Sequence, residues 1–259
     1  SQIFPNGLID LGLRHADPST DLQKKQQESI YLIDQWCNQY EEKIRRLGGI
    51  GFFLGGIGPD GHIAFNIRGS DHNSTTRLME TNFETQAAAA TDLGGIEISK
   101  NRLVITIGLG TITYNKHATA IIIAAGEAKA PIVKMSLETE QDVRYPATAL
   151  QKLKNSRFYI TEGASKALRD TKEHYWQNVP WDIEKKQNAL LYLAKKKNKY
   201  GKKLLYDDLV NDPICKNIPG LDEQTVSQII KSVDQKVQLG IKTETDQVFY
   251  HTGPHHDDI

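Results

Sequence analysis

The sequence predicts an α/β fold, a three-layer sandwich with a mainly parallel sheet, followed by a helical segment. Short apolar runs of strand length alternate with helical stretches through residues 1–163, which is the order that a parallel sheet requires. These runs are largely apolar, and residues 118–125 are apolar apart from one threonine, as expected of strands covered on both faces. Beyond about residue 163 the strand signal stops and charged helical sequence follows.

The elements are predicted in order along the chain. A helix is predicted over residues 22–47. The Ser-Thr-Asp triplet at residues 19–21 suits its start, apolar residues then recur at about the helical period, and the glycines at 48 and 49 end it. Residues 67–82 are polar and suit a mobile flap. Strands are predicted at residues 50–54, 103–107, 118–125 and 157–161, and shorter helices at residues 85–91, 126–137 and 145–150.

Changes in composition predict three parts. Residues 1–163 form the α/β domain with its upstream part missing, residues 164–246 form a charged helical linker, and residues 247–259 hold the first strand and motif of a further domain. The lysines around Tyr200 are interpreted as a solvated helix end, with a phosphate or nucleic-acid surface as the alternative.

The composition limits the partners and the compartment. Lys and Arg number 32 and Asp and Glu number 32, so no net charge favours nucleic acid or a membrane surface. The only cysteines, Cys37 and Cys215, are too few and too far apart in sequence to indicate a disulfide framework or a cysteine metal site. No apolar run reaches the ~18 residues of a membrane helix, and no charged-then-apolar leader opens the chain. We therefore expect a cytoplasmic protein with no nucleic-acid and no membrane partner.

The most informative stretch is Gly-Gly-Ile-Gly-Pro-Asp-Gly-His-Ile-Ala-Phe-Asn at residues 55–66, directly after the first predicted strand. Its glycines allow a tight turn and a close approach of the backbone to a ligand. In an open α/β sheet, ligands bind at the carboxyl ends of the strands. Asp60 and His62 are two residues apart on this turn, and a carboxylate beside an imidazole equips it for proton transfer near neutral pH.

This stretch resembles the active-site segment of the glucosamine-6-phosphate deaminase (isomerase) family. The 6-phosphogluconolactonases share the shorter Gly-x-Gly-x-Asp-Gly-His core, whereas Ile-Ala-Phe-Asn after the histidine favours the deaminases. The resemblance covers about residues 30–170. It implies that His62 moves a proton to open the sugar ring, that Asp60 orients His62 or contacts the substrate, and that the loop binds substrate through Gly56, Gly58 and Gly61.

Further segments of the family pattern are present. Lys129, in Gly-Glu-Ala-Lys-Ala at a predicted helix start, corresponds to the family's phosphate-binding lysine; an ordinary surface lysine is the alternative. The Gly-x-Gly-Thr turn at residues 108–111 is expected to be architectural. Arg77 falls where some members carry an arginine of an allosteric phosphate site, but its neighbours do not continue the match, and we interpret it as a surface arginine.

The sequence also departs from the family pattern. Ile67 occupies the position of a glutamate that completes a proton-relay triad, and Thr91 lies where an arginine usually helps to hold the phosphate. The family's phosphate loop and the Asp-Glu pair whose aspartate takes the proton from C2 are not found in residues 1–163. We therefore expect residues 1–259 alone to be inactive.

The end of the chain, Gly-Pro-His-His-Asp-Asp after a predicted strand, resembles the opening motif of zinc-dependent N-acetylglucosaminyl deacetylases. Carried over, His255 and Asp258 would be ligands of a zinc ion and Asp257 the general base. Two ligands leave such a site incomplete, because zinc takes three or four from the protein. A polar tail without metal is the alternative.

Three functions remain open from the sequence. The first is conversion of an amino-sugar phosphate to a ketose phosphate plus ammonia, in amino-sugar catabolism, with no cofactor. The second is a 6-phosphogluconolactonase-type hydrolase, and the third a non-catalytic sugar-phosphate-binding domain, which Ile67 favours. The family resemblance also implies a homo-oligomer.

Overall fold

The computed structural model describes residues 3–4, 8–90, 95–96, 103–169, 172–243, 245–246 and 248. The chain divides into two compact units, Ser1–Arg169 and Asp170–Ile259, and each is described by itself. None of the described helices combines the length and the apolar character needed to cross a bilayer.

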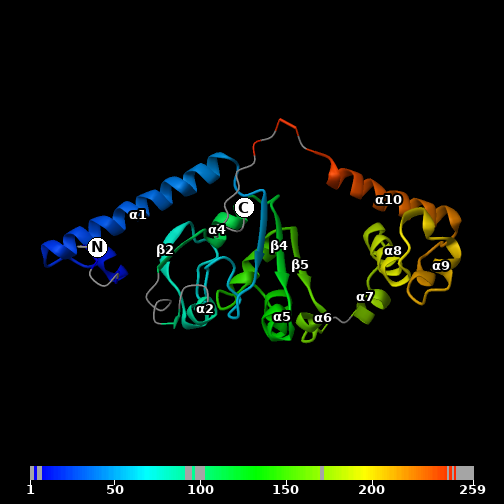
Figure 1. The fold of residues 1–259 in the computed structure, drawn as a ribbon, viewed down its shortest axis with the longest axis horizontal. Helices are drawn as coiled ribbons and strands as arrows, with labels where there is room; N and C mark the ends of the chain where they lie inside the picture. Colours follow the sequence, from blue (N-terminus) through cyan, green and yellow to red (C-terminus); the bar gives the residue numbers. More distant parts are fainter. Residues whose placement is uncertain are drawn as a thin grey trace. The chain divides into compact units, whose positions relative to one another are not determined.

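The first unit contains the sheet (Figure 1). Its elements are η2 (Leu11–Arg14), α1 (Asp21–Arg46), β1 (Phe52–Gly56), β2 (Arg77–Glu80), α2 (Phe83–Ala89), β3 (Leu103–Thr106), α4 (Leu109–Thr113), β4 (Thr119–Ala124), η3 (Glu127–Lys129), α5 (Ala130–Glu138), η4 (Pro146–Lys152), β5 (Asn155–Ile160) and α6 (Glu162–Ser165), where η marks a 3-10 helix.

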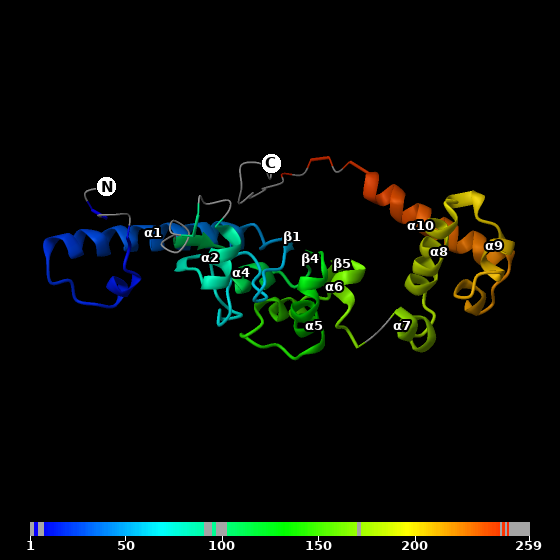
Figure 2. The same cartoon turned by 60° about the horizontal axis from the view of Figure 1, so that its bottom comes forward.

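Three strands form the parallel sheet, in the order β1-β4-β5. Leu54 is opposite Ile121, and Ile123 is opposite Tyr159. Figure 2 shows the three strands beside one another with α5 beneath them. The predicted α/β class with a parallel sheet is confirmed, because each predicted strand at residues 50–54, 118–125 and 157–161 overlaps one of its members.

The sheet buries one face against α4, α5, α6 and η4. Ala120, Ile122 and Ala124 point into this core, at no more than 2% exposure. The other residues of the cluster are Ile57, Ile63, Leu109, Ile112, Ala118, Ile132, Val133, Ala147, Ala149, Leu150, Leu153 and Ala164.

The opposite face of the sheet is exposed. Phe52, Leu54, Ile123 and Tyr159 lie on it, and each is 54–61% exposed. We expected β4 to be covered on both faces. Among the described residues, only one of its faces is covered.

The strand predicted at residues 103–107 exists, but it does not belong to the parallel sheet. As β3 it pairs antiparallel with β2 in a separate two-stranded sheet, with Leu78 opposite Ile105. Ile105 is 47% exposed, so this strand is not fully buried as predicted. Part of the stretch expected to be a polar flap, residues 67–82, forms β2 instead.

The helix predicted over residues 22–47 is α1, with Thr20 as its N-cap accepting a hydrogen bond from the Gln23 amide. Its buried carboxylate, Glu41, accepts hydrogen bonds from the hydroxyls of Thr76 and Thr111 at 3.0 and 2.7 Å. Burial alone would raise the pKa of Glu41, but these bonds and one from Arg45 lower it. The carboxylate thereby ties α1 to the start of β2 and to α4.

The second unit is helical within the described residues and has its own core. Its elements are α7 (Lys172–Asn178), α8 (Ile183–Lys197), η5 (Gly201–Lys203), α9 (Tyr206–Val210), η6 (Cys215–Asn217) and α10 (Glu223–Ile241). The buried residues are Ala189, Leu190, Leu193, Ala194, Leu204, Leu209, Cys215, Ile218, Val226 and Ile229.

Three of the lysines near Tyr200 lie in the last turn of α8, where cations interact favourably with the helix dipole: Lys195, Lys196 and Lys197. Lys197 and Lys199 each approach the Asp208 carboxylate at 3.0 Å, and Lys196 approaches Asp212 at 3.0 Å. Hydrogen bonds from the amide of Leu205 and from Lys199 and Lys197 lower the pKa of Asp208 to about 2. This arrangement supports the solvated helix end over an anion-binding surface.

Candidate active site

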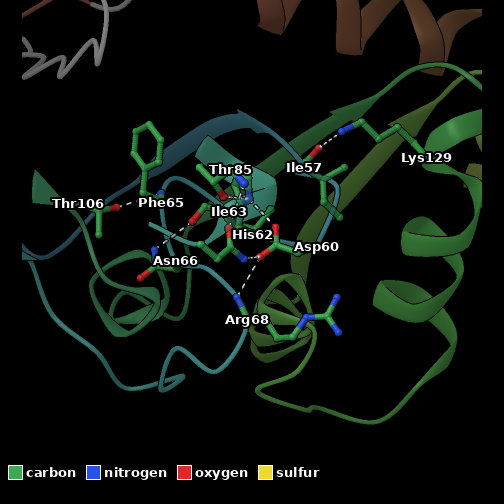
Figure 3. Close-up of polar contacts among 11 residues, drawn as sticks. Ile57, Asp60, His62, Ile63, Phe65, Asn66, Arg68, Thr85, Thr106 and Lys129 are labelled. Atoms are coloured by element: carbon green, nitrogen blue, oxygen red, sulfur yellow. Dashed lines mark hydrogen bonds and ion pairs between the residues drawn. The ribbon is translucent and has the colours of Figure 1, made fainter. Parts of the chain in front are cut away.

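The loop that carries the motif leaves β1 at its carboxyl end (Figure 3). The amide of Gly58 donates to the carbonyl of His62 at 3.0 Å, and the amide of Gly61 donates to Gly58 at 3.1 Å. These two bonds fold residues 58–62 into a tight turn, so that Asp60 and His62 face one another.

Asp60 and His62 form a closely coupled pair. The Oδ1 atom of Asp60 is 2.6 Å from Nδ1 of His62. The Asp60 side chain is fully buried, whereas that of His62 is 15% exposed. The neutral imidazole therefore carries its proton on Nδ1, directed at the carboxylate, and has the lone pair of Nε2 available for a substrate.

The environment of Asp60 keeps it ionised. Burial alone would raise its pKa. Hydrogen bonds from His62, from the Arg68 amide at 3.1 Å and from the Asn82 side-chain amide at 2.6 Å outweigh burial and hold the pKa well below its usual range. The carboxylate is thus a fixed negative charge beside the imidazole at neutral pH.

Two glycines of the motif have identifiable roles in the turn. A Cβ atom on Gly58 would lie 2.0 Å from the His62 ring, so only glycine lets the ring pack on this part of the backbone. Gly61 has a φ of +85°, in the left-handed region that favours glycine. By contrast, a Cβ on Gly56 would meet nothing closer than the Ile123 carbonyl at 3.9 Å.

The residues after His62 anchor the loop to the second sheet. Asn66 is fully buried, and its side-chain amide donates to the carbonyls of Ile63 and Ile107 at 3.0 and 2.8 Å. The amide of Phe65 donates to the Thr106 hydroxyl at 3.1 Å. The Phe-Asn pair of the motif therefore holds the loop in place.

Lys129 reaches the same loop from the start of α5 (Figure 3). Its Nζ atom donates to the carbonyl of Ile57 at 2.7 Å. Partial burial lowers the pKa of Lys129, and the negative charge of Asp60 opposes this. The structure thus brings Lys129 to the loop that carries the Asp60–His62 pair.

The first turn of α2 also contributes to the site, which sequence reasoning missed. Asn82 is the N-cap of this helix and contacts Asp60, and the Thr85 hydroxyl is 3.2 Å from Nδ1 of His62. An Asn-x-x-Thr sequence just before the alanine run is a helix-start signal that would have placed a cap here.

Two further predicted positions are described. Ile67 lies on the loop, and its main chain bonds to Phe65 and Ser70. Arg77 is not the surface residue we expected, because it is only partly exposed and donates to the side chains of Asn66 and Ser70 at 2.9 and 3.2 Å. Its place in β2 packs it against the loop.

The predicted zinc residues His255, Asp257 and Asp258 lie outside the described residues. Within the described part of the chain, no group of three or more His, Cys, Asp and Glu side chains could hold a metal ion. A hollow of about 440 Å³ lies between α5, η4 and β5, and its lining residues include none from the 55–66 loop.

The fold and the site define an α/β protein with a hydrogen-bonded Asp–His pair at the carboxyl edge of a parallel sheet. No protein-family model matches the chain. The chain is 37% identical over 119 residues to the glucosamine-6-phosphate isomerase of Candida albicans, covering 46% of this chain and 48% of that protein. It is 34% identical over 154 residues to the glucosamine-6-phosphate deaminase of Borreliella afzelii, covering 60% and 55%.

Other comparisons give similar coverage. The glucosamine-6-phosphate deaminase of Drosophila melanogaster is 32% identical over 148 residues, covering 57% of this chain and 54% of that protein. A solved monomeric glucosamine-6-phosphate deaminase is 28% identical, with a TM-score of 0.47 over 57% of this chain and 56% of that chain. The chain spans about half the length of the curated relatives it matches.

Proposed function

We propose that this chain is a glucosamine-6-phosphate deaminase-like part of an enzyme that converts an amino-sugar phosphate to a ketose phosphate plus ammonia. The observation that carries the proposal is the Asp60–His62 pair, at 2.6 Å, on a loop at the carboxyl end of β1. Relatives that are 32–37% identical to the aligned part of this chain are named as deaminases or isomerases of glucosamine 6-phosphate.

Each site residue has a proposed role. His62 accepts a proton from the anomeric hydroxyl and returns one to the ring oxygen, and the Asp60 carboxylate stabilises the imidazolium that forms in between. Lys129 binds the phosphate with its ammonium group near the start of α5. Gly56, Gly58 and Gly61 let the backbone approach the sugar. Acid–base groups and phosphate anchoring suffice for this reaction, so we propose that it uses no cofactor or metal.

One observation favours a second candidate function, binding without turnover. Ile67 occupies the place of the family's relay glutamate and cannot carry a proton. If the reaction requires that glutamate, the same loop would bind a phosphorylated sugar without converting it.

The product assay separates these candidates. The longest polypeptide that the coding sequence specifies would be incubated with glucosamine 6-phosphate, and ammonia would be measured. The proposal expects ammonia in proportion to enzyme. Calorimetric binding of the sugar phosphate with no ammonia would instead support the binding domain, and acid release from 6-phosphogluconolactone would support the hydrolase.

The remaining proposals follow from the same assignment. We propose a cytoplasmic homo-oligomer with a phosphorylated amino sugar as its small-molecule partner. We propose further that residues 1–259 alone do not turn over, because residues 1–163 lack the family's C2 base. The His255, Asp257 and Asp258 cluster remains a proposed zinc motif of a deacetylase-like domain, testable by zinc binding to the same longest polypeptide.

A further inference from the structure

The second oxygen of the Asp60 carboxylate has its own set of donors. Oδ1 faces His62, while Oδ2 accepts from the Arg68 amide at 3.1 Å and from Nδ2 of Asn82 at 2.6 Å. Because Asp60 is 1% exposed, water does not compete for these bonds. The Asn82 contact is the shorter of the two, and it comes from a different element of the fold.

Asn82 is itself held in one orientation. As the N-cap of α2, its Oδ1 atom accepts a hydrogen bond from the Thr85 amide at 3.0 Å. Turning the side-chain amide over would place its nitrogen against that N–H and its oxygen against the Asp60 carboxylate. Both contacts would then be repulsive, so the cap fixes Asn82 as a donor to Asp60.

Thr85 contacts the other member of the pair. Its hydroxyl lies 3.2 Å from Nδ1 of His62 and its residue is 3% exposed. The first turn of α2 therefore touches both the carboxylate and the imidazole. Arg68 contacts Asp60 through its backbone amide, which every substitution except proline leaves in place.

We infer that Asn82 and Thr85 are positioning residues that hold Asp60 and His62 in one arrangement, with the ring proton on Nδ1 and Nε2 directed to the substrate. The arrangement of these four side chains does not depend on the proposed function. Only the identity of the substrate at Nε2 rests on it. Ring opening needs Nε2 as the acceptor, so a ring that rotates or changes tautomer loses the productive arrangement. The start of α2 thus contacts and supports both members of the pair.

The test separates capping from positioning. Asn82→Ser keeps a side chain that caps helices well but is too short to replace the Asn82 donor at Asp60. Thr85→Val removes the hydroxyl near His62 and keeps the amide that bonds Asn82. Thr20→Ala removes the N-cap of α1, far along the chain from the pair, and serves as the matched control.

The readout is the ¹⁵N NMR spectrum of the His62 imidazole in the 259-residue chain, assigned with His62→Gln. We expect a single tautomer, protonated on Nδ1, in the unmodified chain and in Thr20→Ala. We expect the Nε2-protonated tautomer to appear in Asn82→Ser and to a lesser extent in Thr85→Val. Retention of the single tautomer in both site variants would overturn the inference. Should Asn82→Ser fail to fold, Thr85→Val decides alone.

Turnover gives the second readout and keeps the two proposals distinct. In the longest polypeptide, Asn82→Ser should lower kcat for ammonia release by between about tenfold and a hundredfold with little change in KM. An equal kcat would count against positioning. If the unmodified polypeptide releases no ammonia, the proposed function fails, while the NMR experiment still decides the inference.

Discussion

At the scale of single residues, the site depends on close contacts more than on charge. The His62 ring packs directly on Gly58, the Asp60 carboxylate is enclosed by three donors besides the ring, and Lys129 is bound to the carbonyl of Ile57. Each contact fixes a group that would otherwise be mobile on a loop. Small steric changes in this turn should therefore have large effects.

Gly58→Ala is the sharpest steric test. The new Cβ would lie 2.0 Å from the imidazole, so the ring must move, at a cost in unfolding free energy of about 1–3 kcal/mol. Chemical denaturation and the His62 NMR signals should both change. Gly56→Ala is the matched control, because its Cβ would meet only an ordinary contact at 3.9 Å. Equal effects of the two substitutions would contradict the packing that we describe.

Asp60 should make the stability of the first unit dependent on pH. Because its pKa is lowered on folding, its contribution is fully present above the unfolded value of about 3.9 and is lost as the pH falls below it. Hydrogen exchange of the β1 and β4 amides reports the unfolding free energy of the unit and can be measured from pH 6 down to pH 3. Over this range the unfolding free energy should fall less in Asp60→Asn than in the unmodified chain. Glu140→Gln, at an exposed site, is the control and should show the same pH dependence as the unmodified chain. If the curve of Asp60→Asn also runs parallel to that of the unmodified chain, the assignment is refuted.

At the scale of elements, the parallel sheet has two unlike faces. Ile122 and Ile123 are neighbours on β4, yet one is fully buried and the other is 54% exposed. The buried face holds the core of the unit together. The exposed face contributes little to that core within the described residues.

Substitution of these two isoleucines tests the assignment of the faces. Ile122→Ala should lower the unfolding free energy by about 2–5 kcal/mol, because it leaves a cavity in the core. Ile123→Ala should cost less than about 1 kcal/mol, since its side chain is already in contact with solvent. Urea unfolding of the two variants measures the difference, and a larger cost at Ile123 would show that the face is covered in solution.

The sequence predicted most of these elements but not all of their partners. The helix over residues 22–47 and the three strands of the parallel sheet carry strong periodic and apolar signals, so their positions were correct to within a few residues. The place of β3 in a separate antiparallel sheet was not predicted, because a short apolar run does not reveal which strand lies beside it. Its partner β2 was missed, since Arg-Leu-Met-Glu lies within polar sequence.

The sequence likewise indicated some residues of the site and not others. Asp60 and His62 are two residues apart in sequence, so their contact on a tight turn was foreseeable, and the segment around Lys129 indicated that residue as a candidate. Asn82 and Thr85 act from a separate helix, 22 or more residues away along the chain. Only the folded structure shows that their side chains reach the pair, although the helix-start signal was visible.

At the scale of the whole molecule, the described residues form two hydrophobic cores. The cluster around Ile122 stabilises the first unit, and the cluster around Leu193 stabilises the second. Each unit therefore has the buried apolar contacts that a separately stable domain requires. The catalytic proposal concerns only the first.

Loss of one core should leave the other intact. Leu193 is fully buried, so Leu193→Ala should lower the stability of the second unit by about 2–5 kcal/mol. Hydrogen exchange should show faster opening of α8 and α10 and unchanged protection in β4. Leu150→Ala, at 1% exposure in the first unit, should give the reverse pattern. A loss of β4 protection in Leu193→Ala would show that the two cores are one cooperative structure.

The most direct measurement for the account as a whole is ammonia release from glucosamine 6-phosphate by the longest polypeptide and by its His62→Gln variant. Glutamine can still accept or donate a hydrogen bond, but it cannot take up and return a proton. If His62 opens the sugar ring, the variant should lose about 100-fold or more in kcat while it still binds the sugar phosphate. A variant that releases ammonia at the unmodified rate would contradict the central role that we assign to His62.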